Sequence, residues 1–145
     1  MKIFFAHSVY DYGTEQEKIW LDNIREYYPG GEIISSSTIN DKIDNNDRYK
    51  GMRHVEEKYF FPLIDNSDVV IIVPSQNVKR FTIGAVIEMK YAFSKDKKIQ
   101  IIENGKIRDI DESDKRKCED TVAFHIPGED PVRMIDLIKD KGFNF

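Results

Sequence analysis

The chain has 145 residues, a length typical of one domain, and we expect a single domain over residues 1–145. Its 22 basic and 26 acidic side chains give a net charge of −4 without a basic stripe, which argues against binding of polymeric nucleic acid. No apolar run approaches the roughly 20 residues of a membrane-spanning helix, and the single cysteine, Cys118, cannot form an internal disulfide, so we expect a cytoplasmic protein that does not bind membranes.

The beginning of the chain predicts a strand followed by a helix. Residues 3–6 form an apolar run typical of a strand. Thr14, with Glu17 three residues later, matches a helix capping box, and apolar side chains then recur at helical spacing until Pro29 and two glycines. We therefore expect the first helix between Thr14 and Pro29.

A second strand, a loop and a second helix are expected next. Ile33 and Ile34 start the strand. Residues 40–50 are polar and rich in Asn and Asp, which predicts a long surface loop, and a loop of this length suggests a role such as covering a site. The second helix is expected over residues 52–64.

The clearest strand lies at residues 68–73, which are almost entirely apolar, as strands are when helices cover both faces of a sheet. A helix is expected over residues 83–95 and a further strand over residues 98–102. Asn104–Gly105 then gives a strong hairpin signal, and the returning strand reaches Ile110.

The end of the chain predicts one more strand, over residues 121–126, and a closing helix with Pro131 in its first turn. The charged residues around Cys118 are interpreted as a solvated face. Alternating strands and helices are typical of a parallel sheet with right-handed crossovers. The sequence therefore predicts an α/β protein, a flavodoxin-like or Rossmann-like three-layer sandwich with a mostly parallel sheet of about five strands.

Polar side chains gather where the predicted strands end. In open sheets of this kind, ligands bind in the crevice outside the carboxyl ends of the strands. The polar residues expected on that edge are His7, Ser8, Ser35, Ser36, Ser75, Asn77, Glu103 and Asn104. We expect the binding site among them.

Two expected helix starts are candidate anion sites. Gly13 and Thr14 open the first helix, and Thr82 and Gly84 lie at the start of the third. Free N–H groups and the positive end of the helix dipole favour an anion such as a phosphate there, and glycine lets a ligand approach the backbone closely. Ordinary helix capping is the alternative interpretation of both threonines.

One carboxylate differs from its surroundings. Glu88 lies in a helix otherwise dominated by apolar residues, between Ile87 and Met89. Such a carboxylate is either an exposed side chain without a role or a partly desolvated group directed into the crevice. The second interpretation makes Glu88 a candidate catalytic residue.

Three stretches of the sequence resemble one enzyme superfamily. They are residues 2–17, residues 67–73 with the sequence SDVVIIV, and residues 82–92 with the pattern G-x-x-x-E-x-x-Y-A. In this order they resemble the nucleoside 2-deoxyribosyltransferase superfamily, which includes the deoxynucleoside 5′-monophosphate N-glycosidases. The resemblance implies cleavage or transfer at the N-glycosidic bond of a deoxynucleoside or deoxynucleotide. No cluster of His, Cys, Asp and Glu has the spacing of a metal site, so we expect no metal ion, and we expect no cofactor.

The resemblance also implies roles for single residues. Glu88 falls on the catalytic glutamate, which would attack the anomeric carbon and form a glycosyl-enzyme. A hydroxyl of Tyr10 or Tyr12 would orient that glutamate. Taken from the strand ends, the helix starts and the resemblance together, the candidate substrate-binding residues are His7, Ser8, Gly13, Thr14, Ser75, Thr82 and Gly84.

The sequence departs from the superfamily pattern at two positions. Phe60 lies where an aspartate is common, and Lys90 lies where a glycine is common. A second group must protonate the departing base, and the candidates for this role are His54, Glu56 and Glu57.

Two other functions remain open. A non-catalytic nucleotide-binding or sensing module would use the same crevice without turnover, and the loss of the aspartate at Phe60 favours it. A Toll/interleukin-receptor-like domain that cleaves NAD would share the flavodoxin-like sheet and the helix glutamate, and residues 6–8 followed by Asp11 faintly resemble it. The expected partner is a small-molecule nucleoside or nucleotide, and the superfamily resemblance implies a homodimer or higher homo-oligomer.

Overall fold

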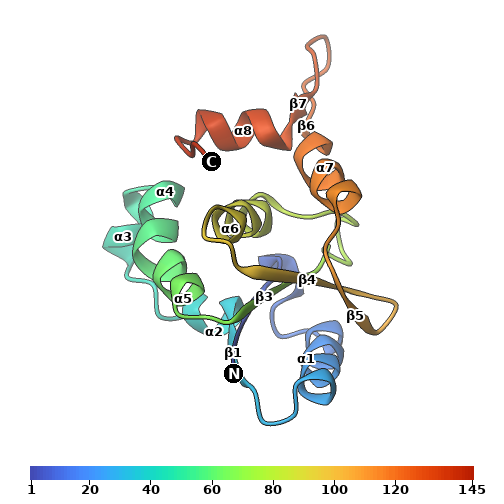
Figure 1. The fold of residues 1–145 in the computed structure, drawn as a ribbon. Helices are drawn as coiled ribbons and strands as arrows, with labels where there is room; N and C mark the ends of the chain where they lie inside the picture. The colour runs from blue at the N-terminus through green and yellow to red at the C-terminus, as the bar shows by residue number, and fades with distance from the viewer.

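A five-stranded sheet in the order β2-β1-β3-β4-β5 forms the centre of the protein in this computed structural model, which describes residues 1–145 (Figure 1). The strands are β1 (Lys2–Ala6), β2 (Glu32–Ser35), β3 (Val69–Ile72), β4 (Lys98–Glu103) and β5 (Lys106–Asp109). The first four are parallel to their neighbours, and β5 returns antiparallel to β4 after the Asn104–Gly105 turn. The predicted α/β class, the mostly parallel sheet and the hairpin are confirmed.

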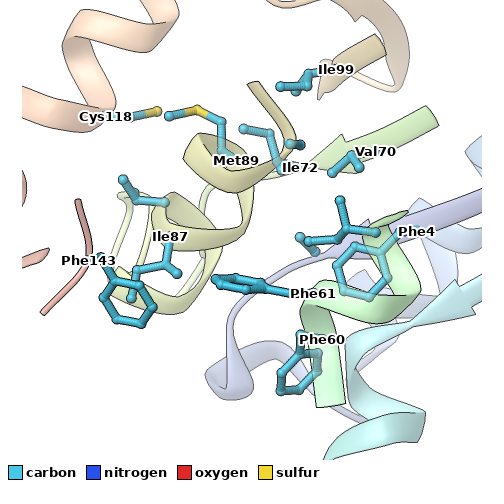
Figure 2. Close-up of a cluster of buried hydrophobic side chains, with 14 of the residues drawn as sticks. Phe4, Phe60, Phe61, Val70, Ile72, Ile87, Met89, Ile99, Cys118 and Phe143 are labelled. Atoms are coloured by element: carbon cyan, nitrogen blue, oxygen red, sulfur yellow. The ribbon is translucent and has the colours of Figure 1, made fainter. Parts of the chain in front are cut away.

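Helices cover both faces of the sheet because successive side chains of a strand point to opposite faces. Ile3 and Phe5 of β1 pack into one core with Trp20 of α1 (Glu15–Tyr27). Phe4 of β1 packs into the second core, on the side of α6 (Ile83–Ser94), as Figure 2 shows. This two-sided burial explains why β3 is apolar throughout.

The helix predicted over residues 52–64 is present but contains a widened turn. It consists of α4 (Met52–Val55), a single π-helical turn η2 (Glu56–Phe60) and α5 (Phe61–Asp65). The N–H of Phe61 donates to the carbonyl of Glu56, five residues earlier. Pro62 follows directly; it has no N–H, and its ring would clash with the carbonyl four residues earlier in a regular helix. The π turn lies where this conflict occurs.

The prediction of a long surface loop over residues 40–50 is wrong, because this segment contains helical structure. It holds the end of α2 (Ser36–Asn40) and the whole of α3 (Asn45–Tyr49). The Asp44 side chain caps α3 by accepting a hydrogen bond from the N–H of Asn46 at 2.8 Å. An Asn- and Asp-rich segment here supplies helix caps rather than irregular structure.

The carboxyl-terminal third also differs from the prediction. The charged stretch around Cys118 is a helix, α7 (Glu112–Asp120), whose first turn is closed by a capping box between Asp111 and Asp114. The strand β6 (Val122–Phe124) pairs with β7 (Val132–Arg133) and not with the central sheet. Because β7 occupies the residues after Pro131, the closing helix α8 (Met134–Asp140) starts later than expected. None of the helices combines the length and the apolar character that crossing a bilayer requires.

Candidate functional site

The carboxyl ends of β1 and β3 lie side by side in the sheet, and the chain leaves them toward opposite faces. After β1 the chain passes through a 3-10 turn, η1 (Val9–Asp11), into α1, whereas after β3 it leads to α6 on the other face. Such a switch point is where open α/β sheets bind ligands. His7 and Ser8 follow β1 and Ser75 follows β3, so these candidates lie at this edge.

Two glutamates form a buried carboxyl pair beside this edge. Glu88 of α6 is 4% exposed and Glu56 of η2 is 5% exposed. Burial raises the pKa of Glu88 to about 8. Burial, and then the charge of Glu88, raises the pKa of Glu56 well above its ordinary range. The two groups therefore retain at least one proton between them at neutral pH.

Glu56 has an unsatisfied oxygen. Its Oε2 atom is buried and has no hydrogen-bond partner, which is costly for a carboxyl group unless a ligand or a proton compensates. Gly84 of α6 lies next to the other oxygen: a β-carbon at position 84 would sit 3.8 Å from Glu56 Oε1. The lack of a side chain at Gly84 leaves the space beside this carboxyl group open.

Of the three candidates for a proton donor, the structure brings only Glu56 next to Glu88. Glu57 is exposed and pairs with Arg53 at 2.9 Å. His54 bonds to Asp47 at 2.7 Å. Phe60, at the position of the superfamily aspartate, is buried in the hydrophobic core.

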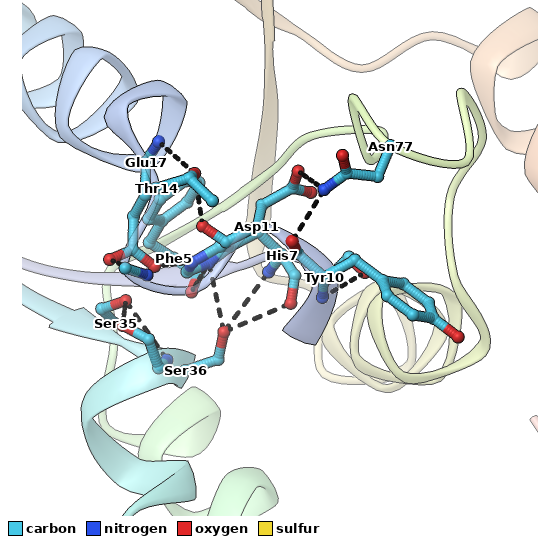
Figure 3. Close-up of polar contacts among 12 residues, drawn as sticks. Phe5, His7, Tyr10, Asp11, Thr14, Glu17, Ser35, Ser36 and Asn77 are labelled. Atoms are coloured by element: carbon cyan, nitrogen blue, oxygen red, sulfur yellow. Dashed lines mark hydrogen bonds and ion pairs between the residues drawn. The ribbon is translucent and has the colours of Figure 1, made fainter.

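The two tyrosine candidates are placed differently. Tyr12 is partly buried, and its pKa is raised by burial and then by the charges of Glu88, Glu56 and Glu17. Tyr12 therefore lies within electrostatic reach of the carboxyl pair. Tyr10 is 61% exposed, and its ring points away from His7 and the other polar side chains labelled in Figure 3.

Tyr10 instead lines a hollow at the start of α6. This cavity, of about 180 Å³, is also lined by Arg80, Thr82 and Ile83. Thr82 is the N-cap residue of α6, its side chain makes no capping hydrogen bond, and the first turn of the helix contains no acidic residue. The hydroxyl and the N–H groups there are available to a ligand.

His7 is the centre of a buried polar network (Figure 3). Its Nε2 lies 2.6 Å from Glu17 Oε2, its Nδ1 lies 3.2 Å from Ser36 Oγ, and its ring stacks on Phe5 with centroids 4.2 Å apart. Burial lowers the pKa of His7, against the opposing effect of Glu17. The lowered pKa favours the neutral ring, whose two nitrogens face Glu17 through Nε2 and Ser36 and the Phe5 carbonyl through Nδ1.

The start of α1 is occupied by the protein's own carboxylate. The N–H of Gly13, which has a φ of 71°, donates to Glu17 Oε1 at 3.3 Å. Thr14 Oγ1 accepts from the N–H of Glu17 at 3.3 Å and donates to the Asp11 carbonyl at 2.7 Å. This geometry corresponds to the capping interpretation of Gly13 and Thr14. Ser8 plays a similar local part, since its hydroxyl accepts from the N–H of Tyr10 at 3.2 Å.

The turn after β3 is tied to the turn after β1. Ser75 Oγ accepts from the N–H of Asn77 at 3.2 Å, and the Asn77 amide donates to the Tyr10 carbonyl at 2.7 Å and to Asp11 Oδ1 at 3.2 Å. Asp11 is 1% exposed and its Oδ2 atom has no partner. Asp11 and Glu17 were not predicted as site residues, because their roles depend on tertiary contacts that no local spacing encodes.

The larger hollows near this edge of the sheet are lined by residues other than the carboxyl pair. One, of about 310 Å³, lies between α1 and the turn after β3 and is lined by Trp20 and Gln76. Another, of about 450 Å³, is lined by Lys79, Arg80 and Lys117. Neither Glu56 nor Glu88 lines these hollows, and both carboxyl groups are closed to solvent in this conformation.

No protein-family model matches the chain, and no curated protein matches it. The fold and the site define an α/β protein with a doubly wound sheet and a buried acid pair beside the carboxyl edge. No three His, Cys, Asp or Glu side chains are grouped as a metal ion requires.

Proposed function

We propose that this protein cleaves, or transfers a group at, the N-glycosidic bond of a deoxynucleoside or deoxynucleotide, with Glu88 as the nucleophile. The observation that carries the proposal is the burial of Glu88 beside Glu56 and Tyr12, next to the edge where sheets of this type bind ligands. The resemblance of residues 2–17, 67–73 and 82–92 to the nucleoside 2-deoxyribosyltransferase superfamily supports the choice of bond.

The form of the pair that holds one proton suits this reaction, because the more acidic Glu88 is then the carboxylate and Glu56 the acid. An ionised Glu88 attacks C1′ of the sugar and forms an ester while the C1′–N bond breaks. The electron pair of that bond goes to the base, and Glu56 transfers its proton to a base nitrogen. Water or a second base then attacks C1′, the ester bond to Glu88 breaks, and Glu56 takes up the proton of the incoming nucleophile.

The surrounding groups give the substrate its orientation. Tyr12, within electrostatic reach of both carboxyl groups, holds the Glu88 carboxylate in place. Thr82 and the free N–H groups at the start of α6 bind the 5′ end of the sugar. Thr82 lies six residues before Glu88, and Gly84 lies four residues, about one helical turn, before it. His7, Ser8 and Ser75 shape the edge from the other side of the crevice.

We also propose the partner, the compartment and the oligomeric state of the protein. The partner is a small-molecule nucleoside or nucleotide, the site needs no cofactor, and the protein works in the cytoplasm as a homodimer or higher homo-oligomer. The free, buried thiol of Cys118 is in keeping with a reducing compartment.

The test is to incubate deoxynucleosides, deoxynucleotides and NAD with the wild type, Glu88→Gln and the exposed control Glu57→Gln, and to separate the products by chromatography. We expect a free nucleobase from a deoxynucleoside or deoxynucleotide with the wild type and the control, and none with Glu88→Gln. Identical traces for all three proteins would refute the proposal. Release of nicotinamide alone would favour the NAD-cleaving alternative, and tight binding with intact nucleotide recovered would favour a sensing module.

A further inference from the structure

A hollow with three cationic side chains lies beside the turn that follows β3. This hollow, of about 450 Å³, is lined by Lys79 and Arg80 of the turn and by Lys117 of α7. The one acidic residue of its lining, Asp120, pairs with Arg133 at 3.4 Å, and none of the three cations has an ion-pair partner in the protein. In a chain with a net charge of −4, the hollow is therefore a local region of positive charge that is available to an anion.

The turn after β3 brings Lys79 and Arg80 to this hollow. The N–H of Ser75 donates to the carbonyl of Arg80 at 2.9 Å, which closes residues 75–80 into a loop. Within the loop, Lys79 has a φ of 54°, a left-handed conformation that is uncommon for a residue with a β-carbon. The closed loop thus places the two cations next to each other at one wall of the hollow.

The guanidinium group of Arg80 is held by the segment that follows α7. Its Nη1 atom donates to the carbonyl of Val122 at 2.7 Å and to that of Ala123 at 2.9 Å. These bonds use one nitrogen of the planar fork, and Nη2 and Nε donate to no protein acceptor. Because the side chain is already fixed, it loses little conformational entropy when its free donors bind a phosphate group.

Arg80 also connects this hollow with the start of α6. It lines the smaller cavity of about 180 Å³ together with Thr82, to which the proposed function assigns the 5′ end of the sugar. A group attached at the 5′ position can therefore continue past Arg80 into the cationic hollow. Along the chain, Arg80 precedes Thr82 and Glu88 follows it, which is the order of phosphate, 5′ carbon and anomeric carbon along a nucleotide.

We propose that the hollow of Lys79, Arg80 and Lys117 binds the phosphate chain of a nucleoside 5′-polyphosphate. This inference rests on the proposed function and names its substrate as a deoxynucleoside di- or triphosphate rather than a nucleoside or a monophosphate. A single phosphate group carries about two negative charges, whereas three cations around a hollow of this size match a longer chain. The phosphate chain takes no part in the breaking of the C1′–N bond and remains on the sugar.

Binding of inorganic tripolyphosphate tests the hollow without any turnover. Calorimetry in buffer without divalent cations, which would coordinate the phosphate oxygens themselves, compares the wild type with variants that each remove one positive charge. The variants are Lys79→Gln, Lys117→Gln and the control Arg116→Gln, since Arg116 is the exposed neighbour of Lys117 in α7 and does not line the hollow.

We expect Lys79→Gln and Lys117→Gln each to weaken binding of tripolyphosphate about 10-fold, because each loses a hydrogen bond to a charged group. Arg116→Gln should bind it as the wild type does. No binding to the wild type, equal affinities for all four proteins, or inorganic phosphate bound as tightly as tripolyphosphate would each overturn the inference.

Base release tests the substrate class. The substrates are one deoxynucleoside and its 5′-mono-, di- and triphosphates, each with the wild type, Lys117→Gln and Arg116→Gln. We expect kcat/KM of the wild type to rise about 10-fold from the monophosphate to the triphosphate, and Lys117→Gln to lose this gain through KM with kcat unchanged. Arg116→Gln should keep the gain.

The two measurements separate the inference from the function on which it rests. Equal kcat/KM values for the monophosphate and the triphosphate would overturn the inference and leave the proposed function in place. Tripolyphosphate binding as expected, with no base released from any of the four substrates, would overturn the proposed function and leave the hollow as a polyphosphate-binding site.

Discussion

Gly84 and Glu56 face each other where α6 meets the π turn, and a β-carbon on Gly84 would lie 3.8 Å from Oε1 of Glu56. This is an ordinary contact distance for a methyl group, whereas a longer side chain would enter the space beside the carboxyl pair.

We predict that Gly84→Ala keeps base release and increases the free energy of unfolding by up to about 1 kcal/mol, because alanine favours a helix over glycine. Gly84→Leu, in contrast, should lower activity by displacing Glu56. Denaturant unfolding and base release check both variants. Full activity of Gly84→Leu would show that the space beside Glu56 is not used.

Glu88 should make stability fall with rising pH. Burial gives Glu88 a pKa of about 8 in the folded protein against an ordinary value of 4.5, so the folded state holds the proton more tightly than the unfolded chain. The resulting stabilisation is complete below the pKa of the unfolded chain and is lost as pH rises through about 8. We expect the stability of the wild type relative to Glu88→Gln to fall by about 5 kcal/mol between low pH and pH 9.

The measurement is the free energy of unfolding of both proteins from pH 5 to pH 9. His7 is present in both proteins, so its contribution cancels in their difference. Parallel curves for the two proteins would show that Glu88 is not a desolvated carboxyl group.

Glu56→Gln should remove the acid that protonates the departing base. We predict a fall in kcat of about 100-fold for ordinary nucleobases and a much smaller fall for a nucleoside whose leaving group needs no proton. Glu57→Gln, which changes the exposed neighbour, should match the wild type on both substrates. The same loss for good and poor leaving groups would assign Glu56 a structural role only.

Asp47 should hold α3 against the helix that carries Glu56. Its carboxylate accepts from His54 Nε2 at 2.7 Å, from Lys58 Nζ at 2.9 Å and from the hydroxyl of Tyr59, and these bonds keep its pKa well below its usual range. We predict that Asp47→Asn speeds amide hydrogen exchange in α3, while the exposed control Asp41→Asn does not. Unchanged exchange would mean that apolar packing alone holds α3.

The sheet could be predicted from the sequence because each buried strand is a short apolar run with a clear start and end, as in residues 68–73. The helix α7 was not predicted, because its sequence ESDKRKCED is almost entirely charged and only Cys118 reaches the core. Its capping box was the one local signal for it.

The candidate site was predictable in outline only. A single carboxylate in an apolar helix pointed to Glu88, and the structure buries it. The choice of Glu56 over Glu57 depends on the π turn, whose effect on side-chain direction cannot be derived from regular helix spacing. The contacts of Glu17 and Ser36 with His7 join residues from three elements, so only the fold reveals them.

The central claim is that Glu88 forms a covalent bond with the sugar, and trapping that intermediate tests it most directly. A 2′-fluorinated arabinonucleoside slows release of the sugar from a glycosyl-enzyme, so intact-protein and peptide mass spectrometry should find the fluorosugar on Glu88 in the wild type and in Glu57→Gln. No adduct should form on Glu88→Gln. An adduct on another residue, or release of the base from this analogue without any adduct at Glu88, would contradict the account.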